Sequence, residues 1–142
     1  MQREGIDYNK VFSPVVKHSS IRILLALVAQ YELELDQLDV KAIFLHGYLE
    51  EKIYISQRMG FKTAEKENMV CKLKKSLYVL KQSPRQSYKH FDSFIRGKKY
   101  KRSHYDPCVY YNKLPGGDYI YLLLYVNDML IASKSISPID KN

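Results

Sequence analysis

The chain has 142 residues, 46% of them hydrophobic and 27% charged, which suits one globular domain or part of one. Its 23 lysines and arginines outnumber 15 acidic residues, which gives a net charge of +8. This balance makes nucleic acid the first candidate partner, because each cation near a phosphate can release a counterion. An anionic membrane is the second candidate, but no basic amphipathic helix supports it. No segment reaches the roughly 18 consecutive apolar residues of a membrane span.

The cysteines and the first residues indicate a compartment. Cys71 and Cys108 are far apart and form no CxxC pattern, so the sequence predicts neither a zinc site nor a disulfide framework. Residues 1–10 are polar and charged, unlike a signal peptide. We therefore expect a protein of the cytoplasm or nucleus, with reduced thiols, that is not secreted.

One helix and one strand are predicted early in the chain. Apolar residues recur at helical spacing from Ile21 to about Tyr31, and Ser19 or Ser20 is the expected capping residue. Residues 33–40 then alternate between apolar and polar side chains, which predicts a half-buried strand.

The later part of the chain predicts a second helix and a β-hairpin. The pair Ser83–Pro84 begins the helix, because a capping hydroxyl followed by proline suits the first turn, and the helix should end near Gly97. Two apolar runs, residues 119–125 and 129–132, flank the polar tripeptide 126–128 and predict a hairpin. Shorter segments are expected at 41–47 (a short helix) and, in extended form, at 52–57, 70–73 and 108–112. This mixture without regular βαβ alternation indicates the α+β class.

Two aspartates lie at predicted strand ends. Asp39 is near the end of strand 33–40, and Asp128 is at the tip of the hairpin. Carboxylates at strand ends of one sheet can converge, and converging carboxylates hold Mg²⁺, which prefers oxygen ligands and substrate phosphates. Two such ions about 3.5–4 Å apart would clamp an in-line phosphoryl transfer. Each aspartate also has an ordinary alternative, because Asn127–Asp128 suits a hairpin turn and Asp39 suits a solvated strand end.

Five short motifs occur in order along the chain. They are residues 12–17 (FSPVVK), 37–41 (QLDVK), 44–47 (FLHG), 77–85 (LYVLKQSPR) and 124–128 (LYVND). Together they resemble the reverse transcriptase of Ty1/copia-type retrotransposons, and the resemblance covers residues 4–133. It implies a partial right-hand polymerase fold, the palm with part of the fingers, in which helices pack on an antiparallel sheet. We expect this partial domain to occupy residues 1–142, with the thumb and the RNase H domain absent.

The resemblance implies a reaction and its catalytic residues. The reaction is Mg²⁺-dependent, RNA-templated deoxynucleotidyl transfer, with Asp39 and Asp128 as catalytic and metal-binding aspartates. Asn127 departs from the family, which has a further aspartate at that position. An amide oxygen brings no negative charge, and removing one electrostatic element of a transition state costs about 10²–10³-fold in rate. We therefore expect activity to be lost or very weak in this chain alone.

The resemblance also implies residues that bind substrate. The Val40 carbonyl would contact metal or triphosphate, and Phe44 matches the aromatic that abuts the sugar 2′ position, although it also suits a core aromatic. Three polar residues lie in the family's segment near the incoming nucleotide and template, where they also suit a solvated helix entrance: Lys81, Gln82 and Arg85. The implied partners are an RNA template, a DNA primer, deoxynucleoside triphosphates and the remainder of a Pol polyprotein.

Two alternatives to a polymerase remain open on the sequence. The first is a non-enzymatic nucleic-acid-binding remnant, which the charge of +8 and the 13 tyrosines allow through phosphate contact and base stacking. The second is the non-functional product of a decaying, truncated element copy. Binding that weakens steeply with salt would favour the first alternative over the second.

Overall fold

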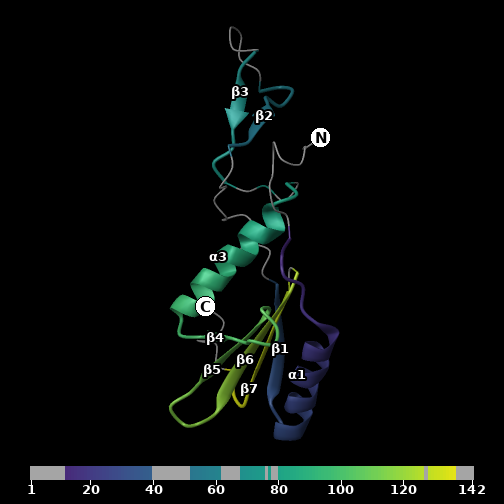
Figure 1. Ribbon diagram of the computed structural model, residues 1–142, viewed down its shortest axis with the longest axis vertical. Helices are drawn as coiled ribbons and strands as arrows, with labels where there is room; N and C mark the ends of the chain where they lie inside the picture. Colours follow the sequence, from purple (N-terminus) through teal and green to yellow (C-terminus); the bar gives the residue numbers. More distant parts are fainter. Residues whose placement is uncertain are drawn as a thin grey trace. The chain divides into compact units, whose positions relative to one another are not determined.

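The computed structural model describes residues 12–39, 52–61, 68–75, 77, 80–126 and 128–136 (Figure 1). The chain divides into two compact units, Met1–Phe12 with Ala42–His90 and Ser13–Lys41 with Phe91–Asn142. Two helices and antiparallel strands make up the described residues, so the predicted α+β class is confirmed. The short helix expected at residues 41–47 lies outside the described residues.

A five-stranded antiparallel sheet forms the centre of the second unit. Its strand order is β1-β7-β6-β5-β4, with every neighbouring pair antiparallel. The strands are Glu34–Asp39 (β1), Lys101–Arg102 (β4), Val109–Lys113 (β5), Tyr119–Tyr125 (β6) and Asp128–Ser133 (β7). The predicted hairpin is confirmed as β6 and β7, and β1 adds to β7 from a distant part of the chain. Only β4 was not expected from the sequence.

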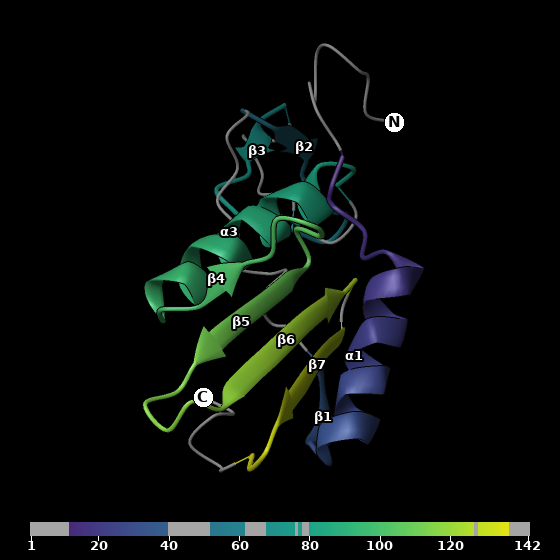
Figure 2. The ribbon, with the colours of Figure 1, turned by 60° about the horizontal axis from the view of Figure 1, so that its bottom comes forward.

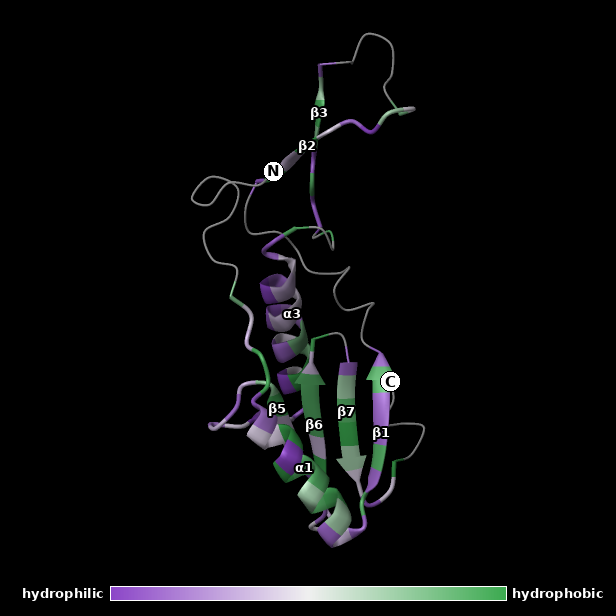
Figure 3. Cartoon of the chain, turned by 90° about the vertical axis from the view of Figure 1, so that its right-hand side faces the viewer, coloured by the Kyte–Doolittle hydropathy of each residue, from purple (hydrophilic) through white to green (hydrophobic). Residues whose placement is uncertain are grey.

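Apolar side chains are buried on both faces of the sheet, with Leu123 on the face opposite to Leu122. Tyr110, Leu122 and Ile131 are successive cross-strand partners on β5, β6 and β7, and all three are buried. Phe91 packs edge-on against the Tyr110 ring, with ring centroids 5.6 Å apart. Figure 3 shows why these strands are central, because β6 and β7 are hydrophobic over most of their length while β1 alternates. Burial of such apolar surface is the main favourable term in folding.

Helix α1, His18–Tyr31, lies alongside β7 and β1 (Figure 2) and buries Leu24. Its C-terminal end is closed by Glu32, whose left-handed backbone (φ 49°) allows its N–H to donate to the Val28 carbonyl. Leu33 also donates its N–H to Val28 O, at 3.0 Å. The helix is therefore joined to β1 by a tight connection that determines where the strand begins.

The N-terminal end of α1 is anchored by Asp106, a carboxylate 89 residues away from Lys17 in the sequence. Asp106 Oδ2 accepts the Lys17 N–H at 2.8 Å and the Ser20 hydroxyl at 2.6 Å, while Oδ1 accepts the Cys108 N–H at 2.9 Å. The expected local cap is wrong, because the helix begins at His18 and has no side-chain cap of its own. A carboxylate at this end also interacts favourably with the helix dipole.

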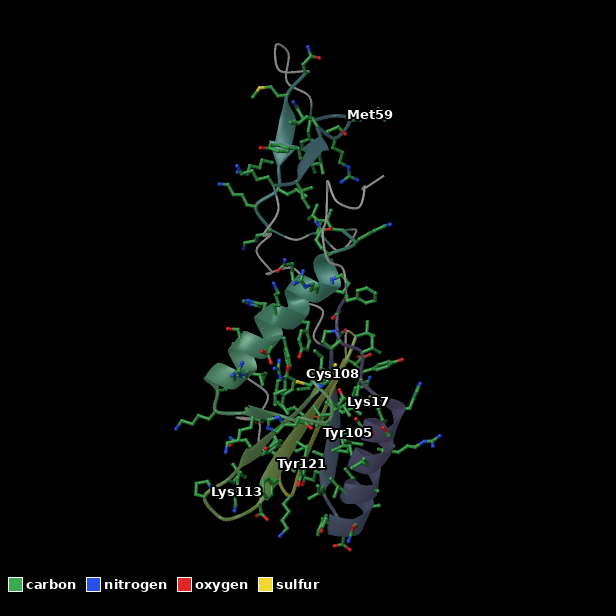
Figure 4. All side chains as sticks on the ribbon, in the orientation of Figure 1. Lys17, Met59, Tyr105, Cys108, Lys113 and Tyr121 are labelled. Carbon is green, nitrogen blue, oxygen red and sulfur yellow. The ribbon has the colours of Figure 1, made fainter. Side chains whose placement is uncertain are left out.

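The same region is tied together by Lys17 and Tyr105, which Figure 4 labels. Lys17 Nζ donates to the Tyr105 carbonyl at 2.7 Å and lies 4.0 Å from the Tyr105 ring centroid. The Ser19 and Tyr105 hydroxyls are 3.1 Å apart, within hydrogen-bond distance. Burial by itself raises the pKa of Asp106, but the hydrogen bonds from Ser20, Lys17 and Cys108 outweigh it and lower this pKa below its usual 3.8.

Replacing Asp106 with asparagine is expected to destabilise the chain by about 1–3 kcal/mol at neutral pH, because buried donors lose a charged acceptor. A carboxyl with a lowered folded pKa stabilises the fold above its unfolded pKa, near 3.8, and loses that effect as pH falls through the folded value. Below about pH 4, the free energy of unfolding of Asp106→Asn should therefore fall less steeply with decreasing pH than that of the native chain. Urea unfolding from acidic to neutral pH measures both effects.

Asp118→Asn is the matched control, since Asp118 is more exposed and pairs only with exposed Lys134 among the interactions described, at 3.2 Å. Such surface pairs contribute about 0–1 kcal/mol. Equal losses in the two variants would contradict the anchoring role of Asp106.

The first unit holds the strands β2 (Tyr54–Ser56) and β3 (Val70–Lys72), which pair antiparallel and confirm the two expected extended segments. Helix α3, Ser83–Gly97, begins in this unit and has the predicted bounds. Within the described residues the Ser83 hydroxyl has no hydrogen-bond partner, so the expected hydroxyl cap is wrong. In the part of the chain that the structure describes, neither helix is long and apolar enough to cross a membrane.

Candidate active site

Asp39 and Asp128 face each other directly across the β1–β7 ladder. Facing residues in antiparallel strands have Cα atoms about 4.5–5.5 Å apart, and their side chains emerge on the same face of the sheet. Two residues that are 89 positions apart in the sequence thus become neighbours. The predicted convergence of the two strand ends is confirmed, while the catalytic role of the aspartates stays a prediction.

Tyr125 extends this pair into a row of three residues on one face. It is the cross-strand partner of Asp128 on β6, so Asp39, Asp128 and Tyr125 lie side by side across three strands. Asp39 and Tyr125 are exposed and Asp128 is half-buried, which leaves the row accessible from solvent. Tyr125 was not expected at the site, although the period of two along residues 119–125 places it on the same face as Tyr119 and Tyr121.

Few side chains at this row could serve as metal ligands. Among the described residues there is no group of three or more histidines, cysteines, aspartates or glutamates that could hold a metal ion. A cation at the row would therefore rely on two carboxylates and on oxygens from a bound substrate. Mg²⁺ is commonly held in this way, by one or two carboxylates together with substrate phosphates.

The turn beside the aspartates is strained. Val126, which follows Tyr125, has a φ of 53° and therefore lies in the left-handed region. For a β-branched residue this conformation is an outlier, and it costs roughly 1–2 kcal/mol. Two-residue hairpin loops favour asparagine or glycine at such positions, because these residues adopt positive φ more readily. Asn127, the other loop residue, lies outside the described residues.

Val126→Asn is expected to raise the stability of the chain by about 1 kcal/mol, since asparagine tolerates the left-handed conformation and Val126 is exposed. The thermal midpoint, followed by circular dichroism, measures this gain. Val15→Asn is the matched control, because Val15 is also an exposed valine but does not have positive φ. A midpoint for Val126→Asn that is no higher than that of the control would show that the turn stores no strain.

The predicted substrate-binding residues are placed as follows. Lys81 is exposed, Gln82 is fully buried and Arg85 is half-buried, and all three lie at or just before the start of α3 in the first unit. The Gln82 carbonyl accepts the Gln86 N–H at 3.1 Å, so part of Gln82 supports the first turn of the helix. Val40 and Phe44 lie outside the described residues. The roles of all five candidates stay predictions.

Comparison with known proteins identifies the family. A family model described as reverse transcriptase (RNA-dependent DNA polymerase) matches residues 1–142. The chain is 56% identical over 133 residues to the Retrovirus-related Pol polyprotein from transposon TNT 1-94 of Nicotiana tabacum, which covers 94% of the chain and 10% of that relative. It is 40% identical over 130 residues to the Retrovirus-related Pol polyprotein from transposon RE1 of Arabidopsis thaliana, which covers 92% of the chain and 9% of that relative.

A more distant relative is the Transposon Ty1-BL Gag-Pol polyprotein of Saccharomyces cerevisiae, 28% identical over 128 residues, covering 88% of the chain and 7% of that relative. No solved structure matches the chain. The chain spans about a tenth of the length of the curated relatives it matches. Because the family model matches every residue and two plant transposon polyproteins align over more than nine-tenths of the sequence, the chain belongs to the reverse transcriptase (RNA-dependent DNA polymerase) family.

Proposed function

We propose that this chain is a partial polymerase domain, the palm with part of the fingers, of a copia-type reverse transcriptase. The observation that carries this proposal is the facing register of Asp39 and Asp128 on neighbouring strands. Family membership supplies the reaction, RNA-templated transfer of deoxynucleotides to a DNA primer. The row of Asp39, Asp128 and Tyr125 would then be the part of the sheet on which the reacting phosphates lie.

The two facing carboxylates fit a divalent cation. Asp39 and Asp128 would hold Mg²⁺ through carboxylate oxygens, and the triphosphate would complete its oxygen ligands. When bound, Mg²⁺ neutralises charge that develops on the transferred phosphoryl group. The residues of the chain contribute position, because the β1–β7 ladder fixes the spacing of the carboxylates before any ligand binds.

Asn127 weakens this site by its charge rather than by its size. Asparagine is nearly isosteric with aspartate, but it contributes no negative charge beside Asp128. Two divalent cations close together repel each other, and negatively charged ligands offset this repulsion. We therefore infer that the chain alone polymerises very weakly or not at all.

The remaining roles follow from the family motifs. Val40 would contribute its backbone carbonyl, and Phe44 would select against a ribose 2′-hydroxyl. The incoming nucleotide and the template would contact residues near the start of α3: Lys81, Gln82 and Arg85. The partners would be RNA template, DNA primer and deoxynucleoside triphosphate, in the cytoplasm or nucleus and with the remainder of a Pol polyprotein.

Asn127→Asp is expected to strengthen Mn²⁺ binding about tenfold or more, because a unit charge about 4 Å from another is worth several kcal/mol near a protein surface. Asp39→Asn in the same background should remove the gain. Proton relaxation of bound water on Mn²⁺ titration measures the affinity without requiring catalysis. Primer extension on an RNA template should rise by about 10²–10³-fold in Asn127→Asp if the complete active site can assemble.

Asp118→Asn is the control for nonspecific charge effects, since Asp118 immediately precedes β6 and Tyr125 is at the other end of that strand. If Mn²⁺ affinity is the same in the native chain, Asn127→Asp and Asp39→Asn, the proposed metal site is wrong. Clear processive synthesis by the native chain alone would instead overturn the inferred loss of activity.

A further inference from the structure

A second polar surface lies on the sheet face that carries the aspartate row. Cross-strand pairing sets Lys101 against Tyr111, Tyr111 against Tyr121, and Lys113 against Tyr119. Because facing residues and residues two apart share a face, these five side chains emerge together. We call them the tyrosine–lysine face, and Figure 4 labels two of its members, Lys113 and Tyr121.

The rings of this face are arranged as a platform. Tyr119 and Tyr121 stack with centroids 5.9 Å apart and an interplanar angle of 18°. Lys113 Nζ lies 5.7 Å from the Tyr119 ring centroid, so a cation borders the stack. Tyr119 is exposed, whereas Tyr111 and Tyr121 are half-buried. Burial first, and then the neighbouring Tyr119 and Tyr31, raise the pKa of Tyr121, so its hydroxyl stays neutral at physiological pH.

The charge of this surface is positive. Lys101 and Lys113 are exposed, and none of the five members is acidic. The neighbouring carboxylate of Asp118 pairs with Lys134 Nζ at 3.2 Å, which offsets its charge. An anion approaching the face therefore meets two lysines and flat aromatic rings.

This surface is distinct from the aspartate row. Tyr119 and Tyr125 are at opposite ends of β6, six residues apart, which corresponds to about 20 Å along a strand. A group bound at the carboxylates cannot at the same time contact Tyr119, although a polynucleotide of several residues spans that distance.

We propose that the tyrosine–lysine face is a binding site for an unpaired segment of RNA or DNA, whose bases stack on Tyr119 and whose phosphates contact Lys113 and Lys101. Unpaired bases expose the flat surface that stacking requires, whereas the bases of a duplex are already stacked on each other. Proteins that bind single strands combine aromatic rings and a basic surface in this way. This binding needs neither a metal ion nor polymerase activity.

The test is fluorescence anisotropy of a labelled oligothymidylate of about 12 nucleotides with the full chain, in EDTA so that metal-dependent binding does not contribute. Tyr119→Ser should weaken binding about 5- to 150-fold, the range measured for loss of one base stack. Tyr119→Phe should retain native affinity, because the ring remains. Lys113→Gln should reduce the slope of log affinity against log salt by about 0.7, the value for one phosphate on a single strand.

The matched control is a second lysine–aromatic pair outside this face, Lys98 over Phe94 with Nζ 5.5 Å from the ring centroid. Phe94→Ser and Lys98→Gln should leave oligonucleotide binding unchanged. Inorganic polyphosphate, which has no bases, should bind Tyr119→Ser and the native chain equally. Circular dichroism checks the fold, and Tyr119→Leu, which keeps an apolar side chain without an aromatic ring, should bind as weakly as Tyr119→Ser.

Three results would overturn the proposal. The first is an equal affinity of Tyr119→Ser and the native chain for the oligonucleotide. The second is a loss of affinity in Phe94→Ser that equals the loss in Tyr119→Ser. The third is an equal affinity of the native chain for the oligonucleotide and for a blunt duplex. A face that instead contacts another protein segment would give the first of these. The Mn²⁺ titration of Asn127→Asp is independent of these outcomes, so failure of the metal site and failure of this surface can be told apart.

Discussion

The antiparallel ladder between β1 and β7 is the constraint on which the candidate active site depends. It sets Asp39 against Asp128, and a register slip of one residue would turn every β1 side chain to the opposite face. β1 is an edge strand, and Leu35 on it is 41% exposed, so burial alone specifies the register weakly. The tight connection from α1 to β1 through Glu32 restrains the register further, because it fixes where β1 begins.

Carboxylates that have no catalytic part stabilise this arrangement. Asp106 binds the start of α1 to the segment before β5. Asp92, on α3, accepts hydrogen bonds from the Tyr110 hydroxyl at 3.0 Å and from Arg102 at 3.3 Å, and so joins the helix to the sheet. In both cases one carboxyl group accepts hydrogen bonds from more than one donor. The elements around the aspartate row are thus fixed by long-range polar contacts as well as by the apolar core.

At the candidate active site, the positions of the two carboxylates and the total negative charge depend on different residues. The sheet holds two carboxylates at facing positions, which is the geometric requirement for a shared cation. In the proposed site, Asn127 supplies no negative charge, whereas the pairing of Tyr125 with Asp128 holds the end of the hairpin in register. A polymerase fold can therefore persist where polymerase chemistry is impaired, because packing and hydrogen bonding maintain the fold while catalysis depends on electrostatics. Contacts to nucleic acid at the tyrosine–lysine face need only rings and cations, and they survive such a loss.

The sequence determined the elements whose signals are local. Helix α3 and the β6–β7 hairpin follow from a proline at a helix start and from two apolar runs around a polar turn, and the structure has them close to the predicted bounds. The five motifs identified the reverse transcriptase family, and period and spacing placed the two aspartates at strand ends. The predicted caps are wrong, because Ser20 and Ser83 look like local caps in the sequence while the partner of a hydroxyl depends on the whole fold; the Ser20 hydroxyl donates to the distant Asp106.

Only the tertiary structure decided which distant residues meet. No local pattern links Asp106 to the start of α1, sets Asp39 against Asp128, or aligns Lys113 with Tyr119, since each pairing depends on strand order and register. The positive φ of Val126 is likewise imposed by the closure of β6 onto β7, against the preference of a β-branched residue. Sequence periodicity specifies on which face of the sheet a side chain lies. Its neighbour on the next strand depends on strand order and register, which are set by the free energy of the whole sheet.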